Sequence, residues 1–425
     1  MPDATLGRCG TPFGSCVGMV SLAWRDVTHR PRPSFGRLGR VLWVNEPARF
    51  QGGAERYVHE TASLLAGRGI RSSLLYDANT PLDTAYVRAF EDGAFPMVDL
   101  AAQVAAINPD LIYVHRLRDL RLLGQLRATG VPMVRFFHDH QLFCLREHKY
   151  TGIGHDTCTR SVGFHCYTCL GFVQRRPDRS LGLRTLSSLE AEQAVNRRLD
   201  AFVVGSSYMA DHVASHGFAR QRIRVLPLYG ELEPRVAPAV CRERDLLLFV
   251  GQLVRGKGLD VLLQALAATR YPARLAIAGD GAQAGEWRGL ASRLGLDQRV
   301  TFHGSLEPSQ LEGLYARAMA LVVPSRSPET FGLAGLEAMQ RGLPVVASRV
   351  GGMREWLCEG ETGLGFPSGD VAALARTVDW LLERPDVAAD MGRAGRVRAA
   401  SLFNADRHLD GLLRLFDEVS GRVQQ

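Results

Sequence analysis

Lysine is almost absent from this chain: of 51 lysine and arginine residues, only Lys149 and Lys257 are lysine. Long apolar runs are absent as well, since no stretch approaches the ~18 to 20 residues that a membrane-spanning helix needs. The net charge of +7 is mild for 425 residues, and the even spread of arginine argues against a nucleic-acid-binding face. These absences leave a globular protein whose partners are anions, such as nucleotides or an acidic lipid surface.

A secretory signal is not expected, because residues 13–24 are weakly apolar and lack a strong basic lead and a convincing cleavage site. We therefore expect a cytoplasmic protein, with peripheral contact at the inner face of the membrane as a second hypothesis. The basic segment 174–198 is the candidate for that contact, and a solvated helix face is its other interpretation. Residues 1–38 are expected to be a flexible extension, or in part a start placed too early.

Short apolar runs alternate with segments of helical periodicity in two successive series, which predicts α/β domains with parallel sheets covered on both faces. The runs of the first series are VLWVN (41–45), SSLLYD (72–77), DLIYVH (110–115), PMVRFF (132–137) and AFVVGS (201–206). Those of the second are LLLFVG (246–251), ARLAIAGDG (273–281), RVTFHG (299–304), ALVVPS (320–325) and PVVAS (344–348).

The chain is too long for one ordinary core, so two Rossmann-like, doubly wound domains facing across a cleft are expected. Prolines interrupt the periodicity around residues 226–244, which indicates a linker. The predicted parts are an N-terminal domain at 39–228, a linker at 229–243, a C-terminal domain at 244–404 and a last helix at 405–425.

Three loops at predicted strand ends have the composition of anion sites. Gly52 and Gly53 open a helix after the first strand, where free N–H groups can receive a phosphate or hydroxyls. An ordinary tight turn is the other interpretation. Lys257 lies between glycines just before another helix, with Arg255 nearby. A solvated basic turn would be the usual interpretation, but the scarcity of lysine favours a diphosphate contact.

The third loop, PSRSPETFGLAGLEAMQRGLP (324–344), contains Glu329 and Glu337 on either side of a predicted helix start. The N–H groups of Phe331, Gly332 and Leu333 would receive an anion. On one helix, eight residues place the glutamates about 80° apart and roughly 12 Å along the axis. They could then hold the hydroxyls on both sides of a diphosphate, or be ordinary dipole-compatible helix residues.

These stretches resemble the donor-binding signature of retaining glycosyltransferases of family four, which have the GT-B fold. PETFGLAGLEAMQRGLPVVAS matches the family's paired-glutamate motif, VGQLVRGKG its phosphate loop and GGAERYVHE its N-terminal glycine loop. The family commonly has arginine directly after the glycine of the phosphate loop. Gln252 stands there in this chain, and Arg255 would supply the charge from three residues on.

The resemblance implies a role for each matched residue. Glu337 would hold the ribose hydroxyls, Glu329 those of the transferred sugar, and Lys257 would neutralise the diphosphate with the N–H groups of the third loop. His138, in FFHDH, matches a histidine near the reacting sugar, and a structural histidine is its other interpretation. The implied reaction is a front-face displacement without a catalytic divalent metal.

The implied function is hexose transfer from a nucleotide-diphosphate sugar to a glycan, lipid-linked or small-molecule acceptor, as in polysaccharide biosynthesis. A nucleotide-sugar epimerase or sugar-phosphate synthase of the same fold is one alternative. A nonenzymatic, metal-stabilised interaction protein is another, which the glutamate pair and Lys257 disfavour. No nucleic-acid partner is expected.

Four of the eight cysteines, Cys144, Cys158, Cys166 and Cys169, lie within one segment after His138. Four thiolates with a C-x2-C pair favour a structural zinc ion. Disulfides, buried thiols and an iron–sulfur cluster remain open as alternatives. His140, His148, His155 or His165 could replace a cysteine ligand. The resemblance implies that this loop, in the N-terminal domain, lies on the acceptor side.

Overall fold

The computed structural model describes residues 38–152, 154, 156–169, 171–175, 181–231 and 242–422. The described residues belong to one compact unit. The predicted N-terminal extension and most of the predicted linker lie outside these ranges. Within them, no helix has the length and apolar character needed to span a bilayer.

The N-terminal domain is built on a seven-stranded sheet of order β3-β2-β1-β4-β5-β8-β9, in which neighbouring strands pair in parallel. Its strands are β1 (Arg40–Val44), β2 (Arg71–Tyr76), β3 (Ala94–Pro96), β4 (Leu111–Val114), β5 (Met133–Phe136), β8 (Ala201–Val204) and β9 (Ile223–Val225). Its helices are α1 (Gly53–Ala66), α2 (Thr84–Val87), α3 (Leu100–Ile107), α4 (Leu120–Ala128), α5 (Leu186–Asn196) and α6 (Ser207–Ala214).

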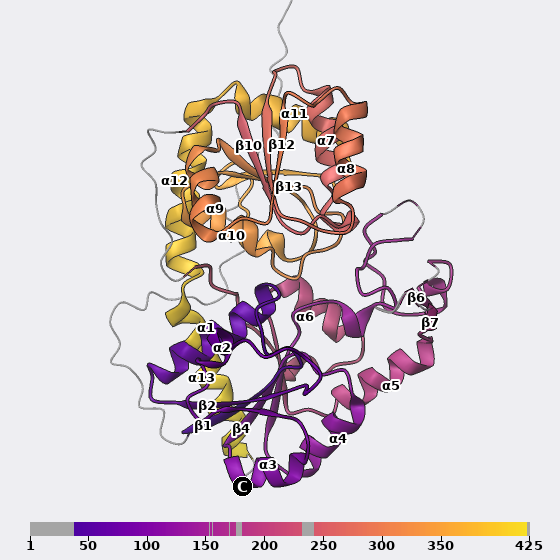
Figure 1. Cartoon of the computed structure of the whole chain (residues 1–425), viewed down its shortest axis with the longest axis vertical. Helices are drawn as coiled ribbons and strands as arrows, with labels where there is room; N and C mark the ends of the chain where they lie inside the picture. The colour runs from indigo at the N-terminus through magenta and orange to yellow at the C-terminus, as the bar shows by residue number, and fades with distance from the viewer. Residues whose placement is uncertain are drawn as a thin grey trace, which may run out of the picture. The chain divides into compact units, whose positions relative to one another are not determined.

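The C-terminal domain repeats this plan with a six-stranded parallel sheet of order β12-β11-β10-β13-β14-β15 (Figure 1). Its strands are β10 (Leu246–Val250), β11 (Arg274–Ala278), β12 (Val300–Gly304), β13 (Ala320–Val323), β14 (Val345–Ser348) and β15 (Gly363–Phe366). Its helices are α7 (Leu259–Ala268), α8 (Ala284–Arg293), α9 (Pro308–Arg317), α10 (Leu333–Gln340), α11 (Val371–Leu382) and α12 (Pro385–Leu402).

The apolar strands are buried on both faces, as the continuous runs predict. In β10, Leu247 and Phe249 pack with α7, α8 and α11, whereas Leu246 and Leu248 belong to the cluster that includes α9 and α10. Successive side chains of a strand point to opposite faces, so one LLLFV run fills two cores. The prediction of two parallel α/β domains of GT-B type is confirmed.

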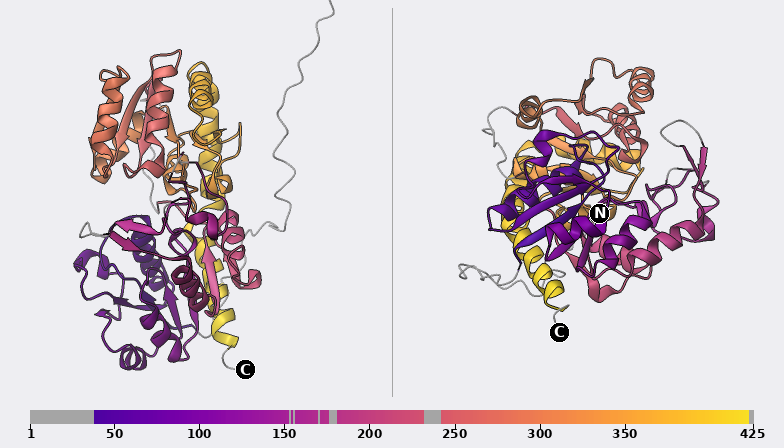
Figure 2. Two further views of the ribbon diagram at one scale, coloured as in Figure 1. Left: turned by 90° about the vertical axis from the view of Figure 1, so that its right-hand side faces the viewer. Right: turned by 60° about the horizontal axis from the view of Figure 1, so that its bottom comes forward.

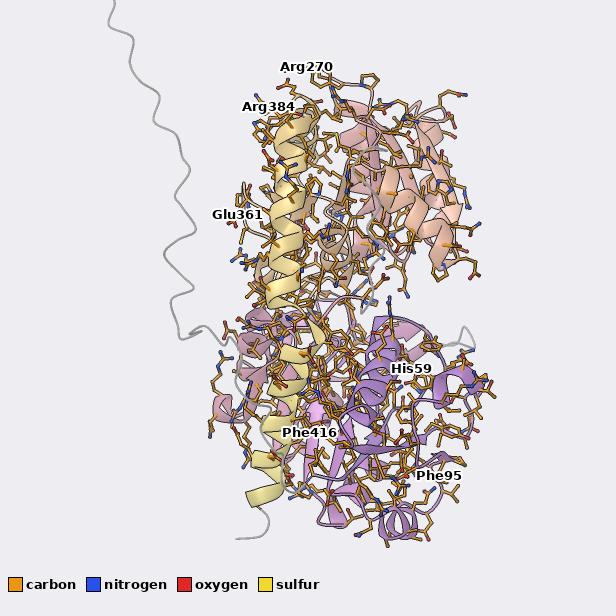
Figure 3. All side chains as sticks on the ribbon, turned by 90° about the vertical axis from the view of Figure 1, so that its left-hand side faces the viewer. His59, Phe95, Arg270, Glu361, Arg384 and Phe416 are labelled. Atoms are coloured by element: carbon orange, nitrogen blue, oxygen red, sulfur yellow. The ribbon has the colours of Figure 1, made fainter. Side chains whose placement is uncertain are left out.

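The last helix, α13 (Ala405–Arg422), packs against the N-terminal domain although it follows the C-terminal one in sequence (Figure 2). The ring of Phe416, labelled in Figure 3, lies 5.0 Å from that of Tyr113 in β4, centroid to centroid. His408 Nδ1 bonds the carbonyl of Pro227 at 2.9 Å. The sequence left open which domain this helix joins, and these contacts settle it.

A small antiparallel hairpin, β6 (Val173–Arg175) and β7 (Leu181–Leu183), follows the cysteine-rich segment. That segment contains two short 3-10 helices, η2 (Gln141–Phe143) and η3 (Phe164–Cys166). The insertion therefore lies between β5 and α5, at the carboxyl edge of the N-terminal sheet. In parallel α/β sheets this is the edge at which ligands bind.

Candidate active site

Lys257 and Glu329, which the sequence predicts to share a site, form an ion pair. Lys257 Nζ lies 2.8 Å from Glu329 Oε1, which also accepts a hydrogen bond of 2.6 Å from the Ser325 hydroxyl. Burial opposes ionisation of Glu329, but the Lys257 ammonium and the two hydrogen bonds outweigh burial and lower the pKa of the carboxyl. Glu329 is therefore ionised at neutral pH.

The two loops that carry this pair meet at a glycine. Lys257 ends the 3-10 helix η6 (Arg255–Lys257), and Gly258 follows with a φ of 69°, a conformation that favours glycine. A Cβ at Gly258 would clash with the carbonyl oxygen of Pro324, in the loop after β13. Glycine is thus needed for the lysine loop to approach the glutamate loop.

Helix α10 begins two residues later than the sequence predicts. Phe331 was expected to open the helix, but Gly332 is the N-cap, with a φ of 87°, and Leu333 is the first helical residue. The carbonyl of Phe331 accepts a hydrogen bond of 2.8 Å from Trp356 Nε1. Glu329 lies before the helix, as predicted, so the separation calculated for two residues along one helix does not apply to this pair.

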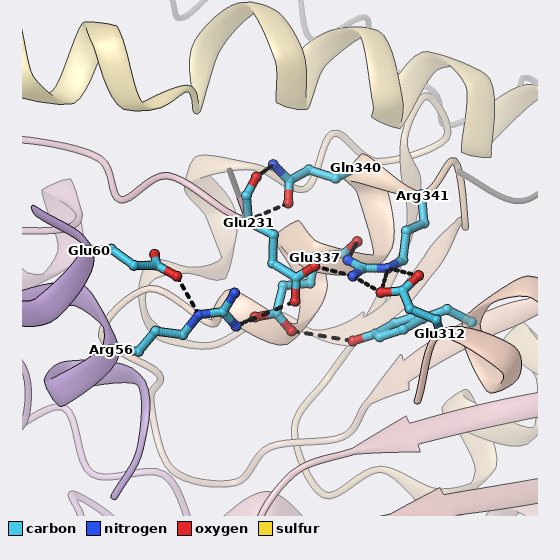
Figure 4. A network of polar contacts seen from close by, with 8 residues as sticks. Arg56, Glu60, Glu231, Glu312, Glu337, Gln340 and Arg341 are labelled. Atoms are coloured by element: carbon cyan, nitrogen blue, oxygen red, sulfur yellow. Dashed lines mark hydrogen bonds and ion pairs between the residues drawn. The ribbon is translucent and has the colours of Figure 1, made fainter. Parts of the chain in front are cut away.

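Glu337, inside α10, lies in a network of alternating charges (Figure 4). Arg56 Nη1, on α1 of the other domain, is 3.5 Å from Glu337 Oε1, and the Tyr315 hydroxyl is 3.4 Å from Oε2. Burial, together with the nearby Glu231 carboxylate, raises the pKa of Glu337 to about 7, although Arg56 and Arg341 act in the opposite sense. Glu337 is thus partly protonated near neutral pH.

Arg341 contributes a second arginine to this network. Its guanidinium pairs with Glu231 and with Glu312, whose Oε1 is 2.9 Å from Arg341 Nε. Burial opposes the charge, but these carboxylates raise the pKa of Arg341. Arg56, Arg341 and Glu231 were not predicted as site residues. Arg56 and Glu231 are distant in sequence from Glu337, whereas Arg341 lies four residues after it and was assigned no role. The signal for Arg56 is its place in the GGAER loop, three residues after Gly53.

The N-terminal glycine loop reaches the start of α10. A Cβ at Gly53 would lie 3.2 Å from Leu333 Cδ1, and both residues line a small cavity with Arg56 and Glu337. Gly52 is the N-cap of α1. The structure therefore brings Gly53, Leu333 and Glu337 together, as a shared donor site requires.

Arg255 lies apart from this group. Its Nη2 is 3.2 Å from Glu286 in α8, and nearly half of its side chain is exposed. The idea that Arg255 replaces the missing arginine at Gln252 therefore rests on the sequence alone.

His138 lies at the end of β5 and is held in an aromatic setting. Its Nε2 is 2.8 Å from His115 Nδ1, and its ring stacks on Phe136 with centroids 4.1 Å apart. Its carbonyl accepts a hydrogen bond of 2.9 Å from the hydroxyl of Thr330, beside Glu329. Burial, with the positive charges of Arg116 and Arg135, lowers the pKa of His138 to about 3. The imidazole is therefore neutral at physiological pH.

The four cysteines, Cys144, Cys158, Cys166 and Cys169, line one cavity, together with His165 and Lys149. Lys149 is almost completely buried there and donates a hydrogen bond to the carbonyl of Arg160. In the described part of the chain, no three His, Cys, Asp or Glu side chains are arranged to hold a metal ion. The described residues thus do not show the predicted zinc site, and His155 lies outside them.

The cysteine-rich segment contacts the loop that carries Glu329. This contact was not predicted from the sequence. The Thr157 hydroxyl bonds the carbonyl of Arg326 at 2.6 Å, and His140 Nε2 bonds the carbonyl of Pro328 at 2.8 Å. The Ser327 hydroxyl donates to the carbonyl of His148. An insertion in the N-terminal domain thereby contacts the loop before α10 in the C-terminal domain.

Two family models match the chain. The model described as Glycosyltransferase Family 4 matches residues 51–228, and that described as Glycosyl transferases group 1 matches residues 236–398. Together they span both parallel sheets apart from β1, and they leave out the end of α12 and all of α13.

Curated relatives agree with these models. A D-inositol 3-phosphate glycosyltransferase from Arthrobacter sp. is 38% identical over 160 residues, which is 36% of this chain and 38% of the relative. In this and similar matches the chain spans 38% to 50% of the relative's length. A D-inositol 3-phosphate glycosyltransferase from Catenulispora acidiphila is 26% identical over 411 residues, 86% of this chain and 90% of the relative.

Solved structures share the fold. Sucrose-phosphate synthase from Thermosynechococcus elongatus has a TM-score of 0.69 at 23% identity and covers 90% of this chain and all of its own. HepE from Anabaena in complex with UDP-glucose has a TM-score of 0.66 at 19% identity, with 90% and 99% coverage. At such identities the likeness concerns the fold alone.

Proposed function

The chain belongs to the glycosyltransferases of family four and group 1, and from this premise we propose that it transfers a hexose from a nucleotide-diphosphate sugar to an acceptor hydroxyl with retention of configuration. The observation that carries the proposal is the partly buried ion pair of Lys257 and Glu329 beside the start of α10. A cation and a carboxylate at that position suit a leaving diphosphate and the hydroxyls of the sugar next to it.

In the proposed reaction, the acceptor oxygen bonds the anomeric carbon on the face from which the diphosphate leaves. The bond between that carbon and the phosphate oxygen breaks, and the acceptor proton passes to an oxygen of the leaving diphosphate. Lys257 and the N–H groups at the start of α10 stabilise the negative charge that develops there. The donor would displace the Lys257 ammonium from Glu329, which frees the carboxylate for sugar hydroxyls.

Glu337 is proposed to bind the ribose hydroxyls, supported by its place in one cavity with Gly53 and Leu333. Hydroxyl groups donate to carboxylates, so a bound ribose would favour the ionised form of Glu337. Because the neutral His138 cannot supply a positive charge, its proposed part is to bind and orient the sugar or acceptor by hydrogen bonds. The acceptor is a glycan, a lipid-linked sugar or a small molecule.

The test is a thermal-shift screen of nucleotide sugars followed by an assay for the released nucleoside diphosphate. UDP-glucose is the first donor to try, because HepE has been solved with it. We expect one donor to raise the melting temperature and to release its nucleoside diphosphate when acceptor is present. An epimerase would convert the donor without releasing nucleoside diphosphate, and a sugar-phosphate synthase would require a sugar phosphate as acceptor. A protein that binds no nucleotide sugar would contradict the proposal.

A structural zinc ion on the four cysteines remains a separate proposal. Its support is that the four thiols line one cavity with the buried Lys149, whose charge would balance the net negative charge of a four-thiolate zinc centre. The thiols would have to close around the ion. Elemental analysis of protein purified without chelator should find one equivalent, and less than ~0.2 equivalents would exclude the site, since structural zinc is normally retained.

A further inference from the structure

Arg135, in the middle of β5, is a buried cation whose hydrogen-bond partners are neutral. It is 5% exposed. Its Nη1 bonds Asn196 Oδ1 at 2.5 Å and its Nη2 bonds the carbonyl of Leu117 at 3.2 Å. Its Nε has no partner among the described residues, and no described carboxylate forms an ion pair with it. Burial lowers the pKa of Arg135 to about 10, although the carboxylates of Asp139, Glu46 and Glu192 act in the opposite sense, so the group remains charged at neutral pH.

Such a charge is costly to keep without a counter-ion. Buried ionised side chains in proteins are almost always paired, because the interior replaces the hydration of the ion poorly. Neither Asn196 nor the Leu117 carbonyl supplies a negative charge. The carboxylates of Asp139, Glu46 and Glu192 favour the charge without forming an ion pair with it, so an anion bound in contact with the guanidinium would stabilise the charge further.

Arg135 lines a cavity of about 310 Å³ in the N-terminal domain. This arginine cavity, as we call it, has as its charged lining residues Arg118, Arg135, Arg184, Glu147 and Glu192. Arg184 Nη2 is 2.6 Å from Glu192 and its Nη1 is 3.3 Å from Glu147, while Arg118 is 3.6 Å from Glu147. Both carboxylates are thus already paired, and the cavity keeps one positive charge in excess.

The arginine cavity adjoins the proposed site of chemistry. A second, smaller cavity has His115, Arg116, His138 and Asp139 among its lining residues, and it shares Arg135, Gln141 and Leu142 with the arginine cavity. The two cavities are therefore neighbours, and Arg135 contributes to the lining of both. A molecule that presents a hydroxyl near His138 could extend an anionic group to the other side of Arg135.

We propose that the arginine cavity binds an oxyanion, a phosphate or carboxylate group, carried by the acceptor. The inference rests on the proposed function, since it assumes that an acceptor reaches His138. The planar guanidinium of Arg135 can donate two parallel hydrogen bonds to a phosphate or carboxylate group. Arg118 and Arg184, which line the same cavity, could donate further hydrogen bonds to the anion. The acceptor is then an anionic sugar or polyol, or an anionic sugar on a carrier, and not a neutral glycan.

The test uses inorganic phosphate on the full chain, with saturating nucleoside diphosphate from the donor screen so that the donor site is filled. Arg135→Met replaces the charge with an apolar side chain of similar length. We expect the variant to bind phosphate at least tenfold more weakly than wild type, as loss of one charge-assisted hydrogen bond implies. Without phosphate it should melt no lower than wild type, because an unpaired buried charge has been removed. Equal phosphate affinity in both proteins would overturn the proposal, as would a wild type that binds neither phosphate nor acetate at millimolar concentration.

A second pair of variants decides the question if Arg135→Met fails to fold. Arg118 lies at the exposed edge of the cavity, and its replacement by glutamine should weaken phosphate binding about threefold. Arg121, in α4, is 88% exposed and does not line the cavity, so Arg121→Gln is the matched control and should bind phosphate as wild type does. Equal phosphate affinity for the two variants would argue against the site.

Two further measurements are needed. One distinguishes a phosphate from a carboxylate ligand, and the other distinguishes failure of the anion site from failure of the proposed function. Acetate titrated in parallel shows whether the cavity prefers a carboxylate or a phosphate; Arg135-dependent binding of either supports the site. In the transfer assay, phosphate should compete with the acceptor and not with the donor, and Arg135-dependent binding without such competition would overturn the assignment to the acceptor. Nucleoside diphosphate affinity should be the same in Arg135→Met and wild type. A wild type that binds no nucleotide would instead defeat the proposed function.

Discussion

In the C-terminal domain Lys257 is paired with Glu329, and Arg341 with Glu312, whereas in the N-terminal domain Arg135 is buried among neutral partners and His138 carries no charge. On the proposed donor side, these charges are thus paired by direct contacts within the chain. On the proposed acceptor side, Arg135 forms no ion pair with a described residue, although the carboxylates of Asp139, Glu46 and Glu192 favour its charge. The comparison indicates that the cations of the first group are neutralised by contact, whereas Arg135 is not.

The largest effect should follow from removing the cation of the donor side. Lys257→Met should lower turnover about 10²- to 10³-fold, because the charge that balances the leaving diphosphate is lost. Initial rates with the donor and acceptor measure this. Arg270→Gln is the control: Arg270 lies at an exposed position of the same domain, labelled in Figure 3, and its loss should leave turnover unchanged. Similar rates for wild type and Lys257→Met would remove Lys257 from the site.

The two glutamates should differ in which half of the donor they bind. Glu337→Gln should weaken binding of the bare nucleoside diphosphate about ten- to a hundredfold, since a charge-assisted hydrogen bond to ribose is lost. Glu329→Gln should leave that affinity within about threefold and lower turnover of the intact donor. Calorimetry with the nucleoside diphosphate, beside initial rates, separates them. If both variants bind the nucleoside diphosphate equally poorly, the pair acts as one structural unit.

The same glutamates should affect stability in opposite ways as pH changes. The pKa of Glu337 is raised from 4.5 to about 7 in the folded protein, so its contribution to stability falls as pH rises between these values. Glu337→Gln should therefore be more favourable, relative to wild type, at pH 8 than at pH 5. The pKa of Glu329 is lowered, so its contribution is present above 4.5 and is lost only in more acid solution. Denaturant unfolding without ligand at both pH values tests this.

For Glu329→Gln, the cost in unfolding free energy should be the same at pH 5 and pH 8. If the unfolding free energies of the two variants, relative to wild type, changed with pH in the same way, the opposite pKa shifts of Glu329 and Glu337 would be contradicted.

The smallest effect should come from the contact between the two domains. Thr157→Val removes the hydrogen bond to the carbonyl of Arg326 and should lower the free energy of unfolding by about 1 kcal/mol. Thr168 donates to His165 within its own segment, and its hydroxyl bond spans three residues. Thr168→Val is thus the matched control for a bond that does not join the domains. If both substitutions leave donor affinity unchanged, the contact only adds stability; if Thr157→Val alone weakens it, the contact also positions the donor loop.

Much of the fold could be predicted because parallel strands that are buried on both faces have continuous apolar sequences. The predicted strand 246–251 became β10, Leu246–Val250, and the run 320–325 became β13, Ala320–Val323. The strands β3 and β9 were missed because each is only three residues long, and β15 has glycine at two of its four positions. Such segments take their conformation from the neighbouring strand and not from their own pattern.

Site residues could be predicted where they belong to one local motif. They could not be predicted where the site joins residues that are distant in sequence. Glu329 and Lys257 were predicted as functional by their loops, and they lie 2.8 Å apart. Arg56 and Glu337 are 281 residues apart in sequence, so no local pattern connects them. Arg135 could have been identified from the sequence, since PMVRFF places a charged residue in an otherwise apolar strand. A charged residue within a predicted buried strand is a candidate functional residue.

The hydrogen bonds from Thr157 and His140 to the loop of Glu329 constrain how this chain can be recombined with its relatives. Exchanging the N-terminal domain for one without residues 140–169 would leave the Arg326 and Pro328 carbonyls without these partners. A chimera meant to combine one donor domain with a new acceptor domain should therefore carry the insertion and its partner loop, residues 324–330, as a single exchangeable piece. In this protein the natural crossover point for domain shuffling is set by that contact as well as by the linker.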